Sequence, residues 1–124
     1  MLTFKKLGFE DVKTDAFGGE VIIRVNAESV KHYARKVKLL KRVEEMKLSD
    51  DDSSAYCVAA GLMSICTNPS NNEYSFHDDQ LDDVVNSISF ELLMDLTSAN
   101  SKLNPHNFES AELVKTMNAK KKSI

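Results

Sequence analysis

The segment of residues 27–47 constrains the fold most strongly, because its apolar residues recur at the spacing of one face of an α-helix. Asn26, immediately before it, is a residue type that caps helix N-termini. The predicted buried face consists of Val30, Tyr33, Ala34, Val37, Leu40 and Val43. The predicted outer face carries the cations Lys31, Arg35, Lys36, Lys38, Lys41 and Arg42. We therefore expect a long amphipathic helix with a basic surface.

A second helix is predicted over residues 53–67, where small residues alternate with larger apolar ones. Ser49 and Asp52 form a Ser-x-x-Asp start, and the aspartates at 50–52 suit the positive end of the helix dipole. The small residues would let another backbone come close. The Asn- and Pro-containing residues 68–72 then predict a turn.

Two more helices are expected in the second half of the chain. Residues 77–85 place aspartates around apolar positions at helical spacing, which predicts a short amphipathic helix with an acidic outer face. Ser87 or Ser89 can cap the next helix, and Pro105 ends it because proline disfavours a helical residue before it.

The N-terminal region predicts two short strands. Apolar and polar residues roughly alternate over residues 2–7, and a β-branched run over residues 21–25 follows the pair Gly18 and Gly19. The fold class that we expect is therefore mainly α: a small helical domain with a short N-terminal β-hairpin or two-strand element.

The chain length of 124 residues and its 42% hydrophobic content predict one domain. We expect this domain to span residues 1–117, with strands within 1–26, helices within 27–117 including a short one at 110–117, and a flexible basic tail at 118–124. The longest nearly apolar run, 56–66, is about half of the ~20 residues that a membrane span needs. The start of the chain has no secretory signal pattern, so we expect a cytoplasmic protein.

Charge is segregated along the chain. Residues 1–47 hold 11 Lys and Arg against 7 Asp and Glu, residues 48–114 hold 1 against 12, and residues 115–124 hold 4 against none. One interpretation is a head-to-tail contact between copies, which produces spirals when it does not close. The candidate self-association residues are Lys38, Lys41 and Arg42 on the basic helix and Asp78, Asp79, Asp82 and Asp83 on the acidic segment. The alternative is a set of solvated helix faces that differ in sign.

No residue pattern indicates catalysis, a metal site or a cofactor. His32, His77 and His106 lie in no catalytic signature, and the acidic groups lack the calcium-loop order. Cys57 and Cys66 would be about 13 Å apart in one helix, which is too far for a disulfide, so we expect two buried structural thiols. We therefore expect a non-enzymatic protein.

Nucleic-acid binding by the basic helix over residues 27–47 is the alternative function. Six cations on that helix and three consecutive lysines in the tail would favour it. The pI of about 5.6, the 7% aromatic content and the absence of tryptophan weigh against it.

Four segments, read in order, resemble the tail assembly chaperones of long-tailed, lambda-like bacteriophages. The strand from Phe17 through Gly18 and Gly19 to Arg24 is similar to the family's aromatic-Gly-Gly strand. Residues 59–67 resemble the family's small-residue helix, which leads into a polar turn. The aromatic and acidic segment of Tyr74, Ser75, Phe76, Asp78, Asp79 and Leu81 follows, and Leu103 with Asn104 resembles the Leu-Asn that closes the last core helix.

This resemblance implies a non-enzymatic protein, absent from the mature virion, that coats the aggregation-prone tape-measure protein until tail-tube subunits polymerise around it. It also implies self-association into a spiral or ring. In many such phages a ribosomal frameshift yields a longer second product, and the lysines at 120–122 are compatible with A-rich slippery codons.

A chaperone that releases its client needs moderately apolar surfaces. The candidate client-binding residues come from the small-residue helix, the aromatic segment and the last core helix: Leu62, Met63, Phe76, Phe90, Leu93 and Met94. The alternative for this apolar stripe is a plain core.

Overall fold

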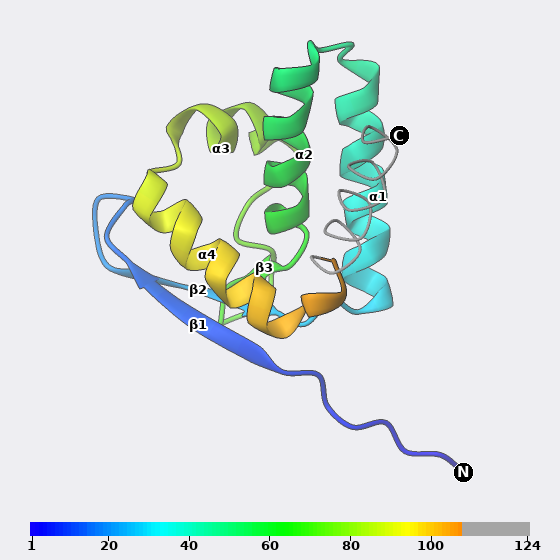
Figure 1. Cartoon of the computed structure of the whole chain (residues 1–124). Helices are drawn as coiled ribbons and strands as arrows, with labels where there is room; N and C mark the ends of the chain where they lie inside the picture. The colour runs from blue at the N-terminus through cyan, green and yellow to red at the C-terminus, as the bar shows by residue number, and fades with distance from the viewer. Residues whose placement is uncertain (108–124) are drawn as a thin grey trace, which may run out of the picture.

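The computed structural model describes residues 1–107 and has helices packed on a small antiparallel sheet, which confirms the mainly α fold class with N-terminal strands (Figure 1). The predicted helix at 110–117 and the tail at 118–124 lie outside the described residues. The helices are α1 (Val30–Glu45), α2 (Asp50–Met63), α3 (Leu81–Ser87) and α4 (Phe90–Leu103), and a 3-10 turn (Asp78–Gln80) precedes α3. No helix in residues 1–107 is long and apolar enough to cross a membrane.

The sheet has the order β1 (Phe9–Thr14), β2 (Val21–Asn26), β3 (Cys66–Thr67), with both pairs antiparallel. The predicted strand at 2–7 is wrong, because residues 1–8 form neither strand nor helix. β1 pairs with β2 in a register that sets Asp11 opposite Arg24. That register turns Val12 toward the core. The predicted strand at 2–7 does not contain this residue.

Helix α1 begins later than expected and buries a different face. Its N-cap is Ser29, whose hydroxyl accepts a hydrogen bond from the backbone N–H of His32. Asn26 ends β2 instead, and its amide donates to the Ile65 carbonyl oxygen at 2.8 Å and to the Thr67 hydroxyl at 3.0 Å. The predicted cap at Asn26 is therefore wrong, because the residue is used in tertiary contacts.

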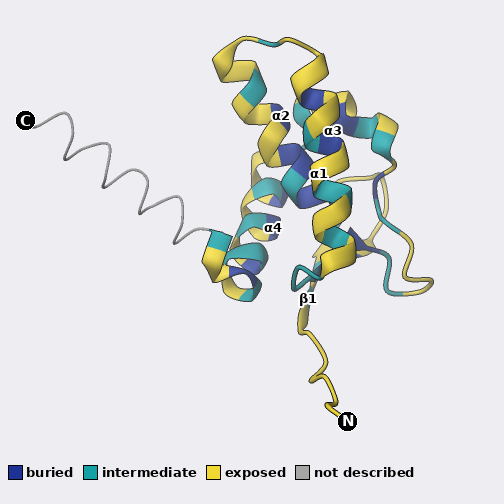
Figure 2. Cartoon of the chain, turned by 90° about the vertical axis from the view of Figure 1, so that its right-hand side faces the viewer, coloured by how far each residue is buried: buried dark blue, intermediate teal, exposed yellow. Residues whose placement is uncertain are grey.

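The buried residues of α1 are Leu39 and Val43, whereas Val30, Tyr33 and Val37 are exposed. Figure 2, which views the molecule from the side of α1, shows much of this helix exposed. The predicted buried face is thus largely wrong. The side chains of Arg35 and Lys36, expected on the outer face, are only 10% and 18% exposed and pack toward the rest of the molecule. A further apolar row therefore stays exposed on the outside of α1, made of these residues: Val30, Tyr33 and Val37.

Helix α2 has the expected cap, but it begins three residues before the predicted start at 53 and ends before the predicted end at 67. The Ser49 hydroxyl accepts a hydrogen bond from the Asp52 N–H, which confirms the predicted cap. The helix ends at Met63, so Cys66 lies in β3, not in the helix. Cys66 is buried and burial raises the pKa of its thiol to about 12, but Cys57 is exposed. The two thiols are free, and the expectation that both are buried is wrong for Cys57.

The core is built from buried side chains of β2, β3 and helices α1 to α4. Helix α4 packs on β1 and β2, while α2 packs against α1 on one side and α3 on the other (Figure 1). Ser89 caps α4 through the N–H of Leu92, and the helix ends at Leu103 before Asn104 and Pro105, as expected. The largest fully buried apolar side chains are Leu39, Met63, Ile65, Leu96 and Val25.

Candidate protein-binding surfaces

Arg35 joins three parts of the chain: helix α1, the end of α2 and the segment 74–78 that leads into α3. Its guanidinium donates to the backbone carbonyl oxygens of Met63 and Phe76 and, through Nε, to Oδ1 of Asp78 at 3.0 Å. The same group lies 3.8 Å from the ring centre of Tyr74, a cation–π arrangement. This contact set holds the aromatic segment 74–76 against α1 and the end of α2.

Asp78 receives a second cation, because Nζ of Lys38 lies 3.2 Å from Oδ2. Burial acts to raise the pKa of Asp78, but the hydrogen bonds and charges of Lys38 and Arg35 outweigh it, so the pKa lies below its ordinary value. A carboxyl whose pKa is lowered in the folded state stabilises the fold above its unfolded-state pKa. That contribution is lost as the pH falls through the folded-state pKa.

Asp78→Asn is therefore expected to lower the free energy of unfolding at neutral pH and to flatten its decline on acidification below about pH 4. Urea unfolding at a series of pH values measures both effects. The neighbouring exposed carboxylate, in Asp79→Asn, is the control and should leave the acid dependence close to that of the wild type. An equal flattening in both variants would contradict the role given to Asp78.

Four of the predicted self-association residues, Lys38, Arg42, Asp78 and Asp79, line one cleft, and some of the predicted residues pair within the chain. Lys38 bonds Asp78, and Arg42 lines the same cleft as Asp78 and Asp79. Asp82 accepts a hydrogen bond from the Tyr56 hydroxyl. Of the remaining predicted residues, Lys41 is exposed on α1 and Asp83 faces a different pocket. The basic and acidic segments thus meet inside one copy through Lys38 and Asp78.

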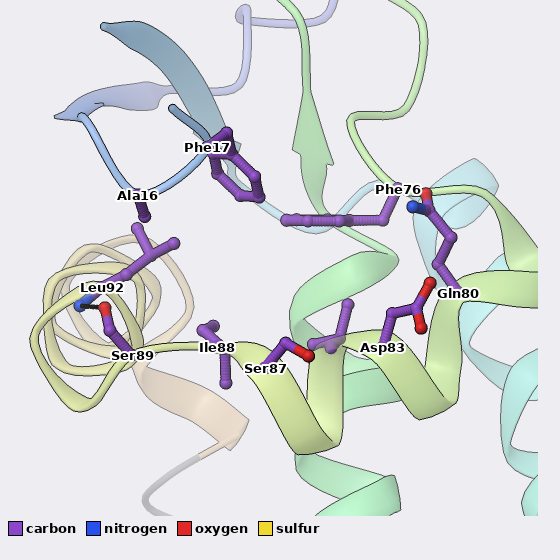
Figure 3. Close-up of a pocket in the computed structure, with 10 residues that line it drawn as sticks. Ala16, Phe17, Phe76, Gln80, Asp83, Ser87, Ile88, Ser89 and Leu92 are labelled. Atoms are coloured by element: carbon purple, nitrogen blue, oxygen red, sulfur yellow. Dashed lines mark hydrogen bonds between the residues drawn. The ribbon is translucent and has the colours of Figure 1, made fainter. Parts of the chain in front are cut away.

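An apolar pocket of about 310 Å³ lies between the β1–β2 loop and the α3–α4 junction (Figure 3). The rings of Phe17 and Phe76 form one wall, with their centres 6.1 Å apart. The opposite wall comes from α3, the α3–α4 junction and the first turn of α4. The pocket is lined by Ala16, Phe17, Phe76, Gln80, Asp83, Val84, Ser87, Ile88, Ser89 and Leu92.

A second pocket adjoins the apolar pocket and shares Ala16, Ser87, Ser89 and Leu92 with it. It has a volume of about 480 Å³. We call it the acidic pocket because its lining holds four carboxylates against one lysine, Lys13, which lies 3.3 Å from Glu20. The carboxylates belong to Asp15, Glu20, Glu91 and Asp95. Sequence reasoning missed both pockets, because their walls come from segments about 60 to 80 residues apart in the chain.

The predicted client-binding residues fall into three groups. Leu62 and Met63 are core residues, 4% and 0% exposed, so the prediction that they bind a client is wrong and the core alternative holds for them. Phe76 is 8% exposed and belongs to the wall of the apolar pocket.

The last helix keeps an apolar surface in solvent. Phe90 is 76% and Met94 47% exposed, and Leu93 between them is half-buried against the core. Residues four apart on a helix lie on the same face. We call Phe90, Leu93 and Met94 the α4 outer surface.

Within residues 1–107 there is no group of three or more His, Cys, Asp and Glu side chains that would hold a metal ion. His32 is used structurally: its Nδ1 lies 3.0 Å from the Tyr74 hydroxyl, and burial lowers the pKa of its ring. The apolar pocket, the acidic pocket and the α4 outer surface are the candidate binding features.

No protein-family model, curated protein or solved structure matches the chain.

Proposed function

We propose that the chain is a non-enzymatic tail assembly chaperone of a long-tailed bacteriophage that binds the tape-measure protein and keeps it soluble during tail assembly. The motif order from Phe17 to Asn104 supports this proposal by its resemblance to that family. In this proposal the chaperone works in the host cytoplasm and is absent from the mature virion. Its further partners are other copies of itself, a frameshifted longer form and the tail-tube protein.

The single observation that carries the proposal is the α4 outer surface. A 76% exposed phenylalanine at the start of a helix has no role in the core, and Met94 extends its apolar face by one helical turn. An exposed i, i+4 apolar pair is the kind of surface against which an amphipathic client helix packs. Methionine adapts to differently shaped partners, which suits a client with many unlike segments.

The small size of the chain adds a second argument. One domain of 124 residues covers only a short part of a long client. Each contact must also be weak enough to be replaced when tube subunits arrive. Many copies with a modest apolar surface meet both needs, because the combined affinity of several weak contacts far exceeds that of one.

The test is co-expression of the tape-measure protein with the wild type or with the double variant Phe90→Asp, Met94→Glu. The wild type should move the client into the soluble fraction, and the double variant should lose most of this effect. Aspartate is favourable in the first turn of a helix and glutamate is a good helix former, so α4 should remain folded. Soluble client, measured by quantitative gel analysis, is the readout.

The matched control is Val30→Glu, Val37→Glu, which removes two exposed apolar side chains from α1 instead. It should retain the solubilising effect. A client that is no more soluble with the wild type than without it would overturn the chaperone function. If both double variants lost the solubilising effect equally, the α4 outer surface would not be the client-binding surface.

Nucleic-acid binding by the basic helix has less support. Nζ of Lys36 lies 2.7 Å from Oε2 of Glu28, and Arg35 and Lys38 both bond Asp78. Three of the six predicted cations are thus held in local ion pairs with two carboxylates, which leaves fewer free charges for phosphates.

A further inference from the structure

The first eight residues form an exposed arm that runs away from the body of the molecule (Figure 1). Leu2 is 93%, Phe4 95% and Leu7 61% exposed. Its base is held in place, because the carbonyl oxygen of Gly8 accepts a hydrogen bond from the Ala27 N–H at 2.9 Å. The arm therefore presents four large apolar side chains, those of Met1, Leu2, Phe4 and Leu7, together with Lys5 and Lys6, outside the fold.

The sequence of the arm is complementary to the two pockets described above. In an extended chain Leu2, Phe4 and Lys6 lie on one face, about 7 Å apart in steps of two residues. The apolar pocket has the size of one or two large side chains, and the acidic pocket adjoins it. Phe4 in the apolar pocket would thus place Lys6 near the carboxylates of Glu91 and Asp95.

The arm of the same copy does not reach this position with Phe4. The pockets lie beyond Thr14, at the end of β1 opposite to the arm, and the six residues of β1 span about 20 Å. Phe4 is four residues from the anchored Gly8, so its Cα lies at most about 14 Å away. The arm also leaves the strand in the direction away from the β1–β2 loop (Figure 1).

We propose that the arm of one copy binds the apolar and acidic pockets of a second copy, with Phe4 inserted between Phe17 and the α3–α4 junction. The contact is heterologous, since the arm of the second copy remains available for a third. A chain of such contacts forms an open or ring-shaped oligomer. This inference does not depend on the client or on the α4 outer surface.

The first test is the oligomeric mass of the purified full chain by light scattering and sedimentation velocity. The wild type should form oligomers whose mass rises with protein concentration. Phe4→Glu and Phe17→Glu should each shift the chain to monomers, because each places a carboxylate in the same apolar contact. Val30→Glu, which changes an exposed apolar residue on α1, is the matched control and should keep the wild-type mass.

The second test measures the contact directly. A fluorescent peptide of residues 1–8 should bind full-length Phe4→Glu, whose pockets are intact and whose own arm is disabled. Adding Phe17→Glu to this receptor, or Phe4→Glu to the peptide, should weaken binding by about tenfold or more. Salt should weaken it further, through the lysines and carboxylates.

Three results would overturn the proposal. Oligomers that persist in Phe4→Glu would show that another surface joins the copies. A wild type that stays monomeric while its arm resists proteolysis would place the arm on its own copy. A peptide that binds the receptor with and without Phe17→Glu equally well would remove the apolar pocket as its site.

Discussion

Arg35→Ala is expected to lower the free energy of unfolding by about 3 kcal/mol, because it removes one partner of a partly buried ion pair together with the donors to two buried backbone carbonyl oxygens. The variant leaves Asp78 with Lys38 alone and takes the donors away from the carbonyl oxygens of Met63 and Phe76. An unsatisfied buried acceptor costs about 1–3 kcal/mol. In a small domain this is a large part of the total stability.

Chemical unfolding followed by circular dichroism measures the loss. Lys41→Ala is the matched control, because it removes an exposed cation from the same helix and should change the stability by less than about 0.5 kcal/mol. Arg35→Lys keeps the positive charge but not the several N–H donors of the guanidinium group. It should therefore recover only a minor part of the stability that Arg35→Ala loses. A similar stability of Arg35→Ala and Lys41→Ala would contradict the organising role of Arg35.

Asn104→Asp is expected to have the second large effect, with a loss of about 3 kcal/mol near neutral pH. Asn104 is 1% exposed, its Oδ1 accepts from the Glu28 N–H at 2.7 Å, and its Nδ2 donates to the Asn100 side chain and the Asn26 carbonyl oxygen. A carboxylate would face those two oxygens with a buried negative charge. The end of α4 would then lose its hydrogen bond to the Asn26 carbonyl oxygen at the end of β2, while Oδ1 would still accept from the Glu28 N–H.

The pH dependence of this variant separates the charge from the lost hydrogen bonds. Burial next to two oxygens raises the pKa of the new carboxyl above its unfolded value. The stability of Asn104→Asp should therefore be greater at low pH and decrease as the pH rises through the folded-state pKa. Asn104→Leu lacks the titrating group and is the control. Parallel stability curves for both variants between about pH 4 and pH 7 would contradict the argument.

Local signals predicted three helix ends well. Ser49 and Ser89 cap the helices that follow them, and α4 ends before Pro105. These predictions succeeded because a cap bonds N–H groups within three residues of itself, so no distant contact is needed. The misplaced strand and the wrong cap at Asn26 had the opposite cause, since both positions are decided by pairing partners far along the chain.

The buried face of α1 shows why periodicity was insufficient. Two apolar rows overlap on this helix, one through Val30 and Val37 and one through Leu39 and Val43. The second row is buried because Arg35 and Lys36 beside it find acidic and carbonyl partners in other segments, and their alkyl stems cover apolar surface. The spacing of apolar residues alone carries no information about those partners.

The sequence by itself determined a mainly α domain with an N-terminal pair of strands, together with the caps and breaks that separate its helices, because these depend on neighbours a few residues apart. Only the tertiary structure decided which face of α1 is covered and that Leu62 and Met63 are core while Phe90 and Met94 remain in solvent. The tertiary structure also places the ring of Phe17 next to that of Phe76, and it places the arm at the end of β1 that lies away from the pockets. These outcomes depend on how whole segments pack together, where burial and paired charges outweigh local preference.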